Sequence, residues 1–561
     1  MQHTALKRRL LALTVSGLFL GAVLLIYGFT YSTNDDPTIV AILNGSYSGT
    51  PDGHGIFVKY PLSWVIKTLY SLTTAVAWYP VVMMLIYWLA MGFLLCQLYA
   101  RFPKHPVLIT SLFLAGMSLL WISQIVRFTF STCGAFVASA ASLSYALIRR
   151  EEDRRASKLG PLLLLLCLSY CIRDYFALVS LFFLAVVWLS KYYDRLLKEP
   201  KCWLIPVMGF ASLALCIGCN SLAYSSPEWQ AFLAYNDQRS YVQDYAGVPE
   251  YDGNEALYDS LGYSKRERKC IHDYHYMLLD EFSPEVFQRL YDYVKEQEVT
   301  PSPVQALKKT LKTTVKHYLL FDSEKVRPLQ AASLAAPAAL LLTALFLSIK
   351  DKRHYWIFPL MVLVGLGCMW LYICYNGRYP SRVAFSLRII TVLASVAGFA
   401  ILFTQRPIQP GKRWQEGLGC KALVVLALAA ALFGFSSAWD AVGRASAPER
   451  AAYYVYADAH PEALFLRDTK LSYSNREDSP STNEISTGGW LHYSPLYEKK
   501  LADLGLTEIS RSTLLQPNVY LIAAEDKDIR TLLGVGKKTP LDYEVVAELD
   551  GVCIYQFFSI G

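Results

Sequence analysis

Long apolar stretches alternate with short polar segments along most of the chain. A stretch of about 20 residues almost free of charge is typical of a transmembrane helix, because the hydrocarbon core of a bilayer is about 30 Å thick. Stretches of this kind lie at 10–30, 78–98, 106–126, 128–148, 202–222, 329–349, 355–375, 384–404 and 420–437. The pattern therefore predicts a polytopic α-helical membrane protein.

One further apolar stretch, 160–190, is interrupted at its midpoint by Arg173 and Asp174. A charge at the bilayer centre costs roughly 2.5–3.5 kcal/mol on insertion scales. Two shorter helices that meet at a turn containing Arg173-Asp174-Tyr175 avoid this cost. We therefore expect about eleven transmembrane helices.

Basic residues indicate how these helices are oriented. Lys7, Arg8 and Arg9 precede the first stretch, which is longer than a typical signal-peptide core and lacks a convincing cleavage site, so it reads as a retained signal anchor. With the N-terminus in the cytoplasm, every inner loop is basic, as the positive-inside rule requires. The inner-loop residues are Arg101, Lys104, Arg149, Arg150, Arg154, Arg155, Lys158, Lys191, Arg195, Lys198, Lys201, Lys350, Lys352, Arg353, Arg406, Lys412 and Arg413.

The large polar segments then lie outside the plasma membrane. They are a first outer loop at about 31–77, a second at about 223–328 and a C-terminal segment. We expect residues 1–437 to form the membrane module and 438–561 an extracytoplasmic domain. In that domain, 463–466 and 519–523 read as buried strands, and 545–549 and 552–558, joined by Asp550-Gly551, as a hairpin. A small α/β domain follows.

The second outer loop carries helices of its own. Ser283-Pro284 and Ser302-Pro303 each read as an N-cap followed by a proline at the first helical position. The second of these helices is basic and amphipathic, with Val304, Leu307, Leu311, Val315 and Tyr318 at helical spacing. Such a helix suits either the membrane interface or packing against neighbouring loops.

Composition agrees with a membrane protein, since 54% of the residues are hydrophobic and only 18% are charged. The net charge of +7 comes mainly from inner loops and does not indicate nucleic-acid binding. Most of the twelve cysteines lie within apolar stretches, and the Cys216/Cys219 pair is better read as small buried side chains than as a zinc or redox site.

An acidic doublet, Asp35-Asp36, follows the first membrane helix directly. Two adjacent carboxylates can supply a general base, a metal ligand or both. Alternatively, Asp36 before Pro37 caps a short helix, which would leave Asp35 free.

The position of this doublet resembles the glycosyltransferase C (GT-C) superfamily, which includes protein O-mannosyltransferases and aminoarabinose transferases of lipid A. Short motifs resemble in particular uncharacterised GT-C-like proteins of Gram-positive bacteria. They are Asp35-Asp36-Pro37, 44–49, Trp78-Tyr79-Pro80, Arg173-Asp174-Tyr175, 377–382, and Gly488-Gly489-Trp490 followed by Ser494-Pro495.

The resemblance implies a transferase that takes a sugar from a polyprenyl-phosphate donor in the bilayer. The acceptor would be a glycan, lipid or protein at the outer face of the plasma membrane. Asp35 or Asp36 would be the catalytic base or bind a divalent metal ion, the one cofactor implied, with Asp174 as a second acid or metal ligand.

A phosphate leaving group needs cationic stabilisation, which the planar fork of arginine supplies well. The outer-turn arginines are Arg378, Arg382, Arg173 and Arg127. For each arginine the alternative is snorkelling or ion pairing, for instance of Arg173 with Asp174. Further substrate-binding candidates in the outer loops are His54, Lys59, Asp237 and Arg239.

Two other functions stay open. A polymerase or ligase of lipid-linked polysaccharide uses outer-loop arginines and needs no acidic doublet. A flippase or transporter coupled to ions usually carries an ionisable residue near the bilayer midplane, and the predicted spans hold no Asp or Glu apart from Asp174 at its turn.

Overall fold

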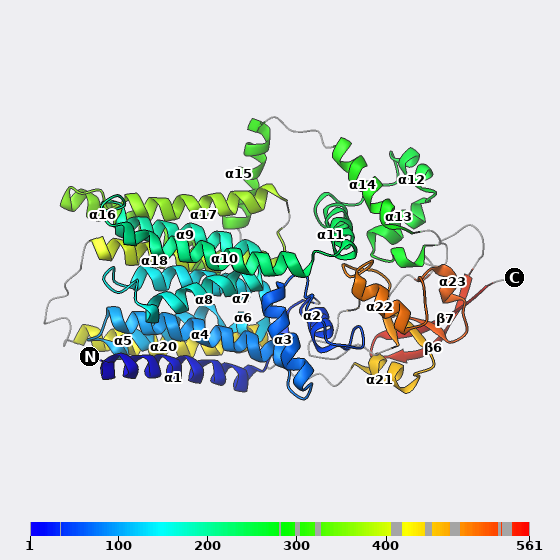
Figure 1. The fold of residues 1–561 in the computed structure, drawn as a ribbon, viewed down its shortest axis with the longest axis horizontal. Coiled ribbons are helices and arrows are strands. Elements are labelled where there is room, and N and C mark those ends of the chain that lie inside the picture. The colour runs from blue at the N-terminus through cyan, green and yellow to red at the C-terminus, as the bar shows by residue number, and fades with distance from the viewer. Residues whose placement is uncertain are drawn as a thin grey trace.

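The structure of the 561-residue chain is a computed structural model. It describes residues 2–33, 35–279, 282–297, 303–319, 327–377, 379–405, 418–443, 451–469, 471, 483–525, 529 and 541–559. Long helices lie side by side in one bundle, and shorter helices and a sheet cover one end of it (Figure 1).

Nine helices in the described part of the chain are long and apolar enough to cross a membrane. They are α1 (Gln2–Tyr27), α4 (Trp78–Arg101), α7 (Phe130–Leu147), α9 (Asp174–Tyr192), α10 (Leu204–Ala223, with the 3₁₀ turn η1, Pro200–Trp203, before it), α16 (Arg327–Asp351), α17 (Ile357–Tyr375), α18 (Ser381–Gln405) and α20 (Leu418–Val442). Two shorter apolar helices, α5 (Pro106–Leu120) and α8 (Ala156–Ile172), bring the number to eleven. The predicted polytopic helical fold is confirmed, and so is the break of the 160–190 stretch at Arg173.

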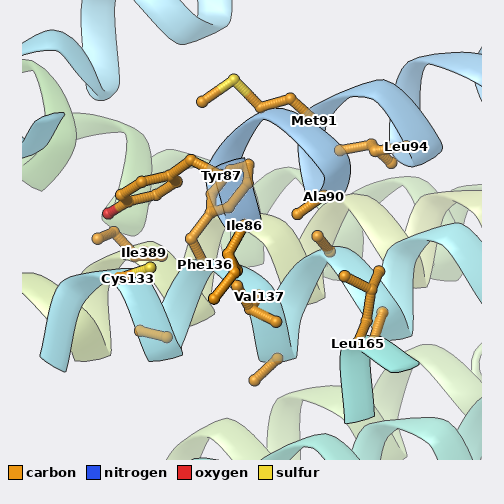
Figure 2. Packing of buried hydrophobic residues seen from close by; sticks show 14 of the residues in the cluster. Ile86, Tyr87, Ala90, Met91, Leu94, Cys133, Phe136, Val137, Leu165 and Ile389 are labelled. Carbon is orange, nitrogen blue, oxygen red and sulfur yellow. The ribbon is translucent and has the colours of Figure 1, made fainter. Parts of the chain in front are cut away.

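Helix α7 lies at the centre of the bundle and is buried along its whole length. Its many small residues let neighbouring helices approach closely, which is how membrane helices pack. A methyl group on Gly134 would lie 2.8 Å from the ring of Phe176 on α9. Figure 2 shows Phe136 of α7 packed near Tyr87 of α4, within a cluster that also includes Ile389 of α18.

The predicted 106–126 helix is interrupted, and this break helps to position the site. Helix α5 ends at Leu120, and a short helix α6 (Ile122–Val126) follows Trp121. Strand β2 (Arg127–Phe128) then pairs in parallel with β1 (Thr30–Tyr31). This two-residue ribbon holds the start of α7 beside the chain that leads into α2 (Asp35–Asn44).

The outer loops form a helical layer at the same end of the bundle. Its elements are α3 (Tyr60–Leu72), α11 (Pro227–Ser240), the π-helical turn η2 (Tyr241–Ala246), α12 (Glu255–Leu261), α13 (Lys265–His272), the 3₁₀ turn η3 (Tyr276–Leu278), α14 (Pro284–Gln297) and α15 (Pro303–Leu319). Helix α15 leaves Val304, Leu307, Leu311 and Val315 exposed. An exposed apolar stripe favours the interface interpretation of this helix over packing against loops.

The C-terminal part contains a five-stranded mixed sheet in the order β4-β3-β5-β7-β6. The strands are β3 (Leu464–Arg467), β4 (Glu484–Ser486), β5 (Val519–Ala524), β6 (Leu541–Leu549) and β7 (Val552–Ser559), accompanied by α21 (Ala452–Ala459), α22 (Pro495–Asp503) and α23 (Arg511–Leu514). Strand β3 pairs in parallel with β4 and β5, whereas β7 is antiparallel to β5 and β6. The predicted hairpin is confirmed, since Asp550 and Gly551 both have positive φ between paired strands.

The sheet shares one hydrophobic core with the second outer loop. Phe232 of α11 and Tyr276 of η3 belong to the same buried cluster as Leu466 of β3 and Leu521 of β5. Ile42 of α2 also belongs to it. The outer loop and the sheet are therefore packed together above α2, and the division of the chain at 437/438 stays a prediction.

Candidate active site

Asp36 is completely buried at the end of the bundle, where α2 meets α4 and α7. Its Oδ1 accepts a hydrogen bond from the Tyr79 hydroxyl at 2.8 Å and another from the Phe130 backbone N–H at 3.2 Å. Helix α2 begins at Asp35, so Asp36 lies in its first turn and is not its N-cap. Its carboxyl instead accepts the hydrogen bond of a backbone N–H at the start of α7. Together with the bond from Tyr79, this contact connects α2, α4 and α7.

Burial raises the pKa of Asp36 to about 8, and the hydrogen bonds from Tyr79 and Phe130 lower it only in part. The negative charge of neighbouring Asp35 raises the pKa further, while Arg382 lowers it. At neutral pH Asp36 is therefore mainly a protonated carboxyl. Such a group is suited to holding structure and poorly suited to taking a proton.

This pKa has a consequence for stability. The folded state holds a proton on Asp36 that the unfolded chain loses near pH 4, so the Asp36 contribution should fall as pH rises from about 4 to about 8 and stay flat above. Asp36→Asn should remove that slope. Thermal unfolding of both proteins in the same detergent, measured across this pH range, checks the prediction. Parallel curves for the two proteins would contradict it.

Asp35, one residue earlier, keeps some access to solvent and faces a cation. Its Oδ2 accepts a hydrogen bond from the guanidinium of Arg382 at 2.6 Å. The side chains are 11% and 23% exposed. Arg382 lies in the first turn of α18, so two sites predicted from distant parts of the sequence meet here.

Arg173, at the turn between α8 and α9, is a second cation of this region. Its guanidinium lies over the rings of Phe57, Phe130 and Tyr175 at 4.9–5.4 Å from their centroids, and its Nε is buried without a hydrogen-bond partner. Burial lowers its pKa, but Tyr175, Asp174 and Asp35 raise it above the ordinary value on balance. The negative charge of Asp35 thus interacts favourably with both Arg382 and Arg173.

Asp174 does not neutralise Arg173 by a direct ion pair. Its carboxylate binds the ammonium group of Lys59 at 2.8 Å. Lys59 precedes α3, and its backbone N–H donates to the carbonyl of Cys171, so the pair fastens the first outer loop to the top of α8. Two of the predicted site residues are thus partners of each other.

The other predicted site residues lie in contacts of their own. Arg127 is exposed on β2, and Arg378 lies outside the described residues. His54 binds Asp52 at 2.7 Å and stacks on Trp229 at 4.3 Å between ring centroids. Arg239 is buried and bonded to Asn236 and Gln243, whereas Asp237 is exposed on the same helix.

The carboxylates predicted as metal ligands do not form a donor set in the described part of the chain. No group of three or more His, Cys, Asp or Glu side chains suited to a metal ion occurs there. Asp36 already accepts hydrogen bonds from Tyr79, Phe130 and Thr33. Asp35 binds Arg382, and Asp174 binds Lys59. These residues do not fit a divalent ion as they stand.

A pocket of about 60 Å³ opens beside α2, one helical turn after Asp35. Its lining comes from α2, the first outer loop, η3 and the C-terminal part: Thr38, Tyr47, Met277, Arg467, Thr469, Ile485, Ser486, Gly488, Gly489, Trp490, Leu491, His492 and Tyr497. The ring of Trp490 lies 4.7 Å from that of Phe57, over which Arg173 sits. An aromatic contact therefore joins the pocket to the arginine.

The glycine loop of this pocket is held by close backbone contacts. A methyl group on Gly488 would lie 2.3 Å from the carbonyl oxygen of Tyr274, so this position has no room for a larger residue. The Tyr276 hydroxyl donates to the Gly489 carbonyl at 2.6 Å and accepts from its N–H at 2.9 Å. Nearby, His492 is buried with an unpartnered Nδ1, and burial lowers its pKa to about 3. The pocket therefore offers a neutral imidazole.

Sequence reasoning missed the roles of Tyr79, Phe130, Thr38 and His492. Tyr79 stands in the Trp78-Tyr79-Pro80 motif, and His492 follows the Gly488-Gly489-Trp490 motif. The two motifs could therefore have pointed to these residues. Phe130 contributes a backbone N–H, which no side-chain pattern can reveal.

Comparison with known proteins finds no matching family model and no matching curated protein. The similar solved structures include two crystal structures of ArnT from Cupriavidus metallidurans. One is in the apo state, with 12% identity and a TM-score of 0.43, and the other is bound to undecaprenyl phosphate, with 11% identity and a TM-score of 0.42. Each match covers 97% of both chains. Since both TM-scores lie below 0.5, the function proposed below rests on this chain's own residues.

Proposed function

We propose that this protein is an integral membrane glycosyltransferase. It transfers a sugar from a polyprenyl-phosphate donor to a hydroxyl group of a glycan, lipid or protein at the outer face of the plasma membrane. The observation that carries the proposal is the Asp35–Arg382 contact, with Arg173 nearby, at the end of the bundle that the outer layer covers. The arginines can bind the phosphate head of a lipid-linked donor, and the apolar helices that end beside them suit its lipid tail. The carboxylate can act on the acceptor.

The chemistry follows from these side chains. Asp35 accepts the proton of the acceptor hydroxyl as its oxygen attacks the anomeric carbon. The bond from that carbon to the phosphate oxygen breaks on the opposite side, which inverts the anomeric configuration. The leaving polyprenyl phosphate keeps the electron pair, and Arg382 and Arg173 stabilise the charge that develops on it.

Arg382 has two anionic partners in this scheme. Without donor it binds the Asp35 carboxylate at 2.6 Å. Donor phosphate competes for the same guanidinium. Binding of the donor therefore draws Arg382 away from Asp35 and leaves the carboxylate available to the acceptor hydroxyl.

Asp36 and Tyr79 act as positioning residues. Their contact holds the first turn of α2 against α4 and α7, and Asp35 is the adjacent residue on that turn. We place the sugar-binding region at the pocket next to Thr38, where Trp490 can stack on a ring and His492 can bond a hydroxyl.

Specific observations favour this function over the alternatives. A polysaccharide polymerase or ligase that relies on arginines alone does not need a carboxylate in contact with one of them. For a transporter, ionisable groups are expected near the bilayer midplane. In the described spans, the carboxylates Asp174, Asp351 and Asp440 stand at or near helix ends.

Purified protein in liposomes should release polyprenyl phosphate from a donor that carries the matching sugar. The assay uses a panel of radiolabelled polyprenyl-phosphate sugars with a mixed cell-envelope extract as acceptor source. Because the lipid product forms whatever the acceptor is, its release reports on the donor alone. Protein-free liposomes and a nucleotide-sugar panel serve as controls. Release from no lipid donor, or turnover of nucleotide sugars instead, would contradict the proposal.

A further inference from the structure

A second cavity is lined by residues at the end of the bundle where α1 begins. This end is opposite the end at which α2, with Asp35, lies (Figure 1). Its volume is about 200 Å³. Four basic residues from different parts of the membrane module line it. They are Arg8 of α1, Arg101 at the end of α4, Arg149 after α7, and Lys158 of α8. Gln97, Ala100, Pro103, Leu147, Ile148 and Glu152 complete the lining.

The charges around this cavity are unbalanced. Glu152 is the one carboxylate of the lining, and it lies 3.5 Å from Arg155, outside the cavity. Lys158 donates to the neutral Gln97 side chain at 2.7 Å, and Arg101 reaches the Thr404 hydroxyl at 3.4 Å. Among the described residues, none of the four cations forms an ion pair. Like charges that face one partly enclosed space repel one another, and an anion within it relieves the repulsion.

The membrane orientation of the chain does not by itself explain why four basic residues surround this cavity. The positive-inside rule requires basic residues at this end but not their convergence on a cavity. Arg9 and Lys104 satisfy the rule from exposed positions and do not line the cavity. Three guanidinium groups and an ammonium group around one space match the oxygens of a phosphate group, which arginine binds through parallel hydrogen bonds.

We propose that this cavity binds a phosphate group, and that an anionic phospholipid headgroup supplies it. Basic pockets between membrane helices on the cytoplasmic side are suited to such headgroups. The bound phosphate would connect α1, α4, α8 and the turn after α7, far from the acidic doublet. The proposal does not depend on the transferase activity.

The test uses the full chain in a zwitterionic detergent and counts bound phosphatidylglycerol by native mass spectrometry, with phosphatidylcholine as the reference lipid. Arg101→Gln/Arg149→Gln should weaken phosphatidylglycerol binding about 10- to 30-fold, since each basic residue near a membrane surface contributes about one kcal/mol. The matched control is Arg9→Gln/Lys104→Gln, which removes the same charge at the same end outside the cavity. It should weaken binding less than threefold.

The melting temperature distinguishes a lipid headgroup from free phosphate. If a lipid is the ligand, inorganic phosphate should leave the melting temperature unchanged relative to chloride at equal ionic strength. A rise in melting temperature that is lost in Arg101→Gln/Arg149→Gln would identify free phosphate in the same cavity. Arg149 is exposed, so Arg149→Gln alone carries the test if the double variant fails to fold. The proposal is overturned if both double variants weaken binding equally. It is also overturned if the protein shows no preference for phosphatidylglycerol and no response to phosphate.

Discussion

Replacement of Asp35 by asparagine should lower kcat for sugar transfer by about 10²- to 10⁴-fold, the usual contribution of a general base. The amide has the shape of the carboxylate but cannot take the proton of the acceptor hydroxyl. Arg382 keeps an oxygen to bond, so the fold should change little. Initial rates of polyprenyl-phosphate release in liposomes, at saturating donor, measure the effect.

Asp36→Asn is the matched control, because the two residues are adjacent and chemically identical. The amide of asparagine resembles the protonated carboxyl that burial favours at this position. We expect a fall in kcat of less than about tenfold, consistent with a positioning role. If Asp35→Asn retains most of its activity and Asp36→Asn does not, the two roles proposed here must be exchanged.

The distinction between these two aspartates was not accessible to sequence reasoning. Both follow the first long apolar helix, and the sequence predicted that much correctly. What separates them is a hydrogen bond from Tyr79, 43 residues away, and one from the Phe130 backbone, 94 residues away. Contacts of that range depend on how α4 and α7 pack, and hydropathy does not encode the packing.

The membrane fold was readable because the bilayer imposes a length and a polarity on each span. Even the division of the 160–190 stretch followed from the cost of placing Arg173 and Asp174 at its midpoint. The break at Trp121 and the ribbon between β1 and β2 were missed, since Trp121 lies in an apolar sequence without a proline or charge. That break brings the start of α7 to the acidic doublet.

In the outer layer too, local features could be predicted from the sequence and long-range contacts could not. The Asp550-Gly551 hairpin was predicted because a two-residue turn with positive φ favours those residues. The shared core between the second outer loop and the sheet was not, because its members, such as Tyr276 and Leu521, are distant in sequence. The glycine loop beside Tyr274 can be recognised as crowded only once both segments are in place.

Replacement of Arg382 by glutamine should lower kcat/KM for the lipid donor by about 10²- to 10³-fold, the usual effect of removing one group that stabilises a developing anion. Glutamine keeps a donor N–H but loses the charge. Arg382→Lys should fall between this variant and the wild type, because it keeps a charge but loses the two parallel N–H groups. Arg266→Gln, at an exposed position of α13, controls for the loss of one positive charge and should leave kcat/KM unchanged.

The product provides a readout that separates phosphate binding from a structural role. Added polyprenyl phosphate should inhibit the wild type and inhibit Arg382→Gln at least about tenfold less well, because the lost contact is to the phosphate itself. Loss of Arg382 also leaves Asp35 largely buried without its cation, so Arg382→Gln should be less stable than Arg382→Gln/Asp35→Asn, in which that charge is removed. If product inhibition is unchanged while the melting temperature falls, Arg382 serves only to hold Asp35, and the phosphate must be bound by Arg173 or another cation.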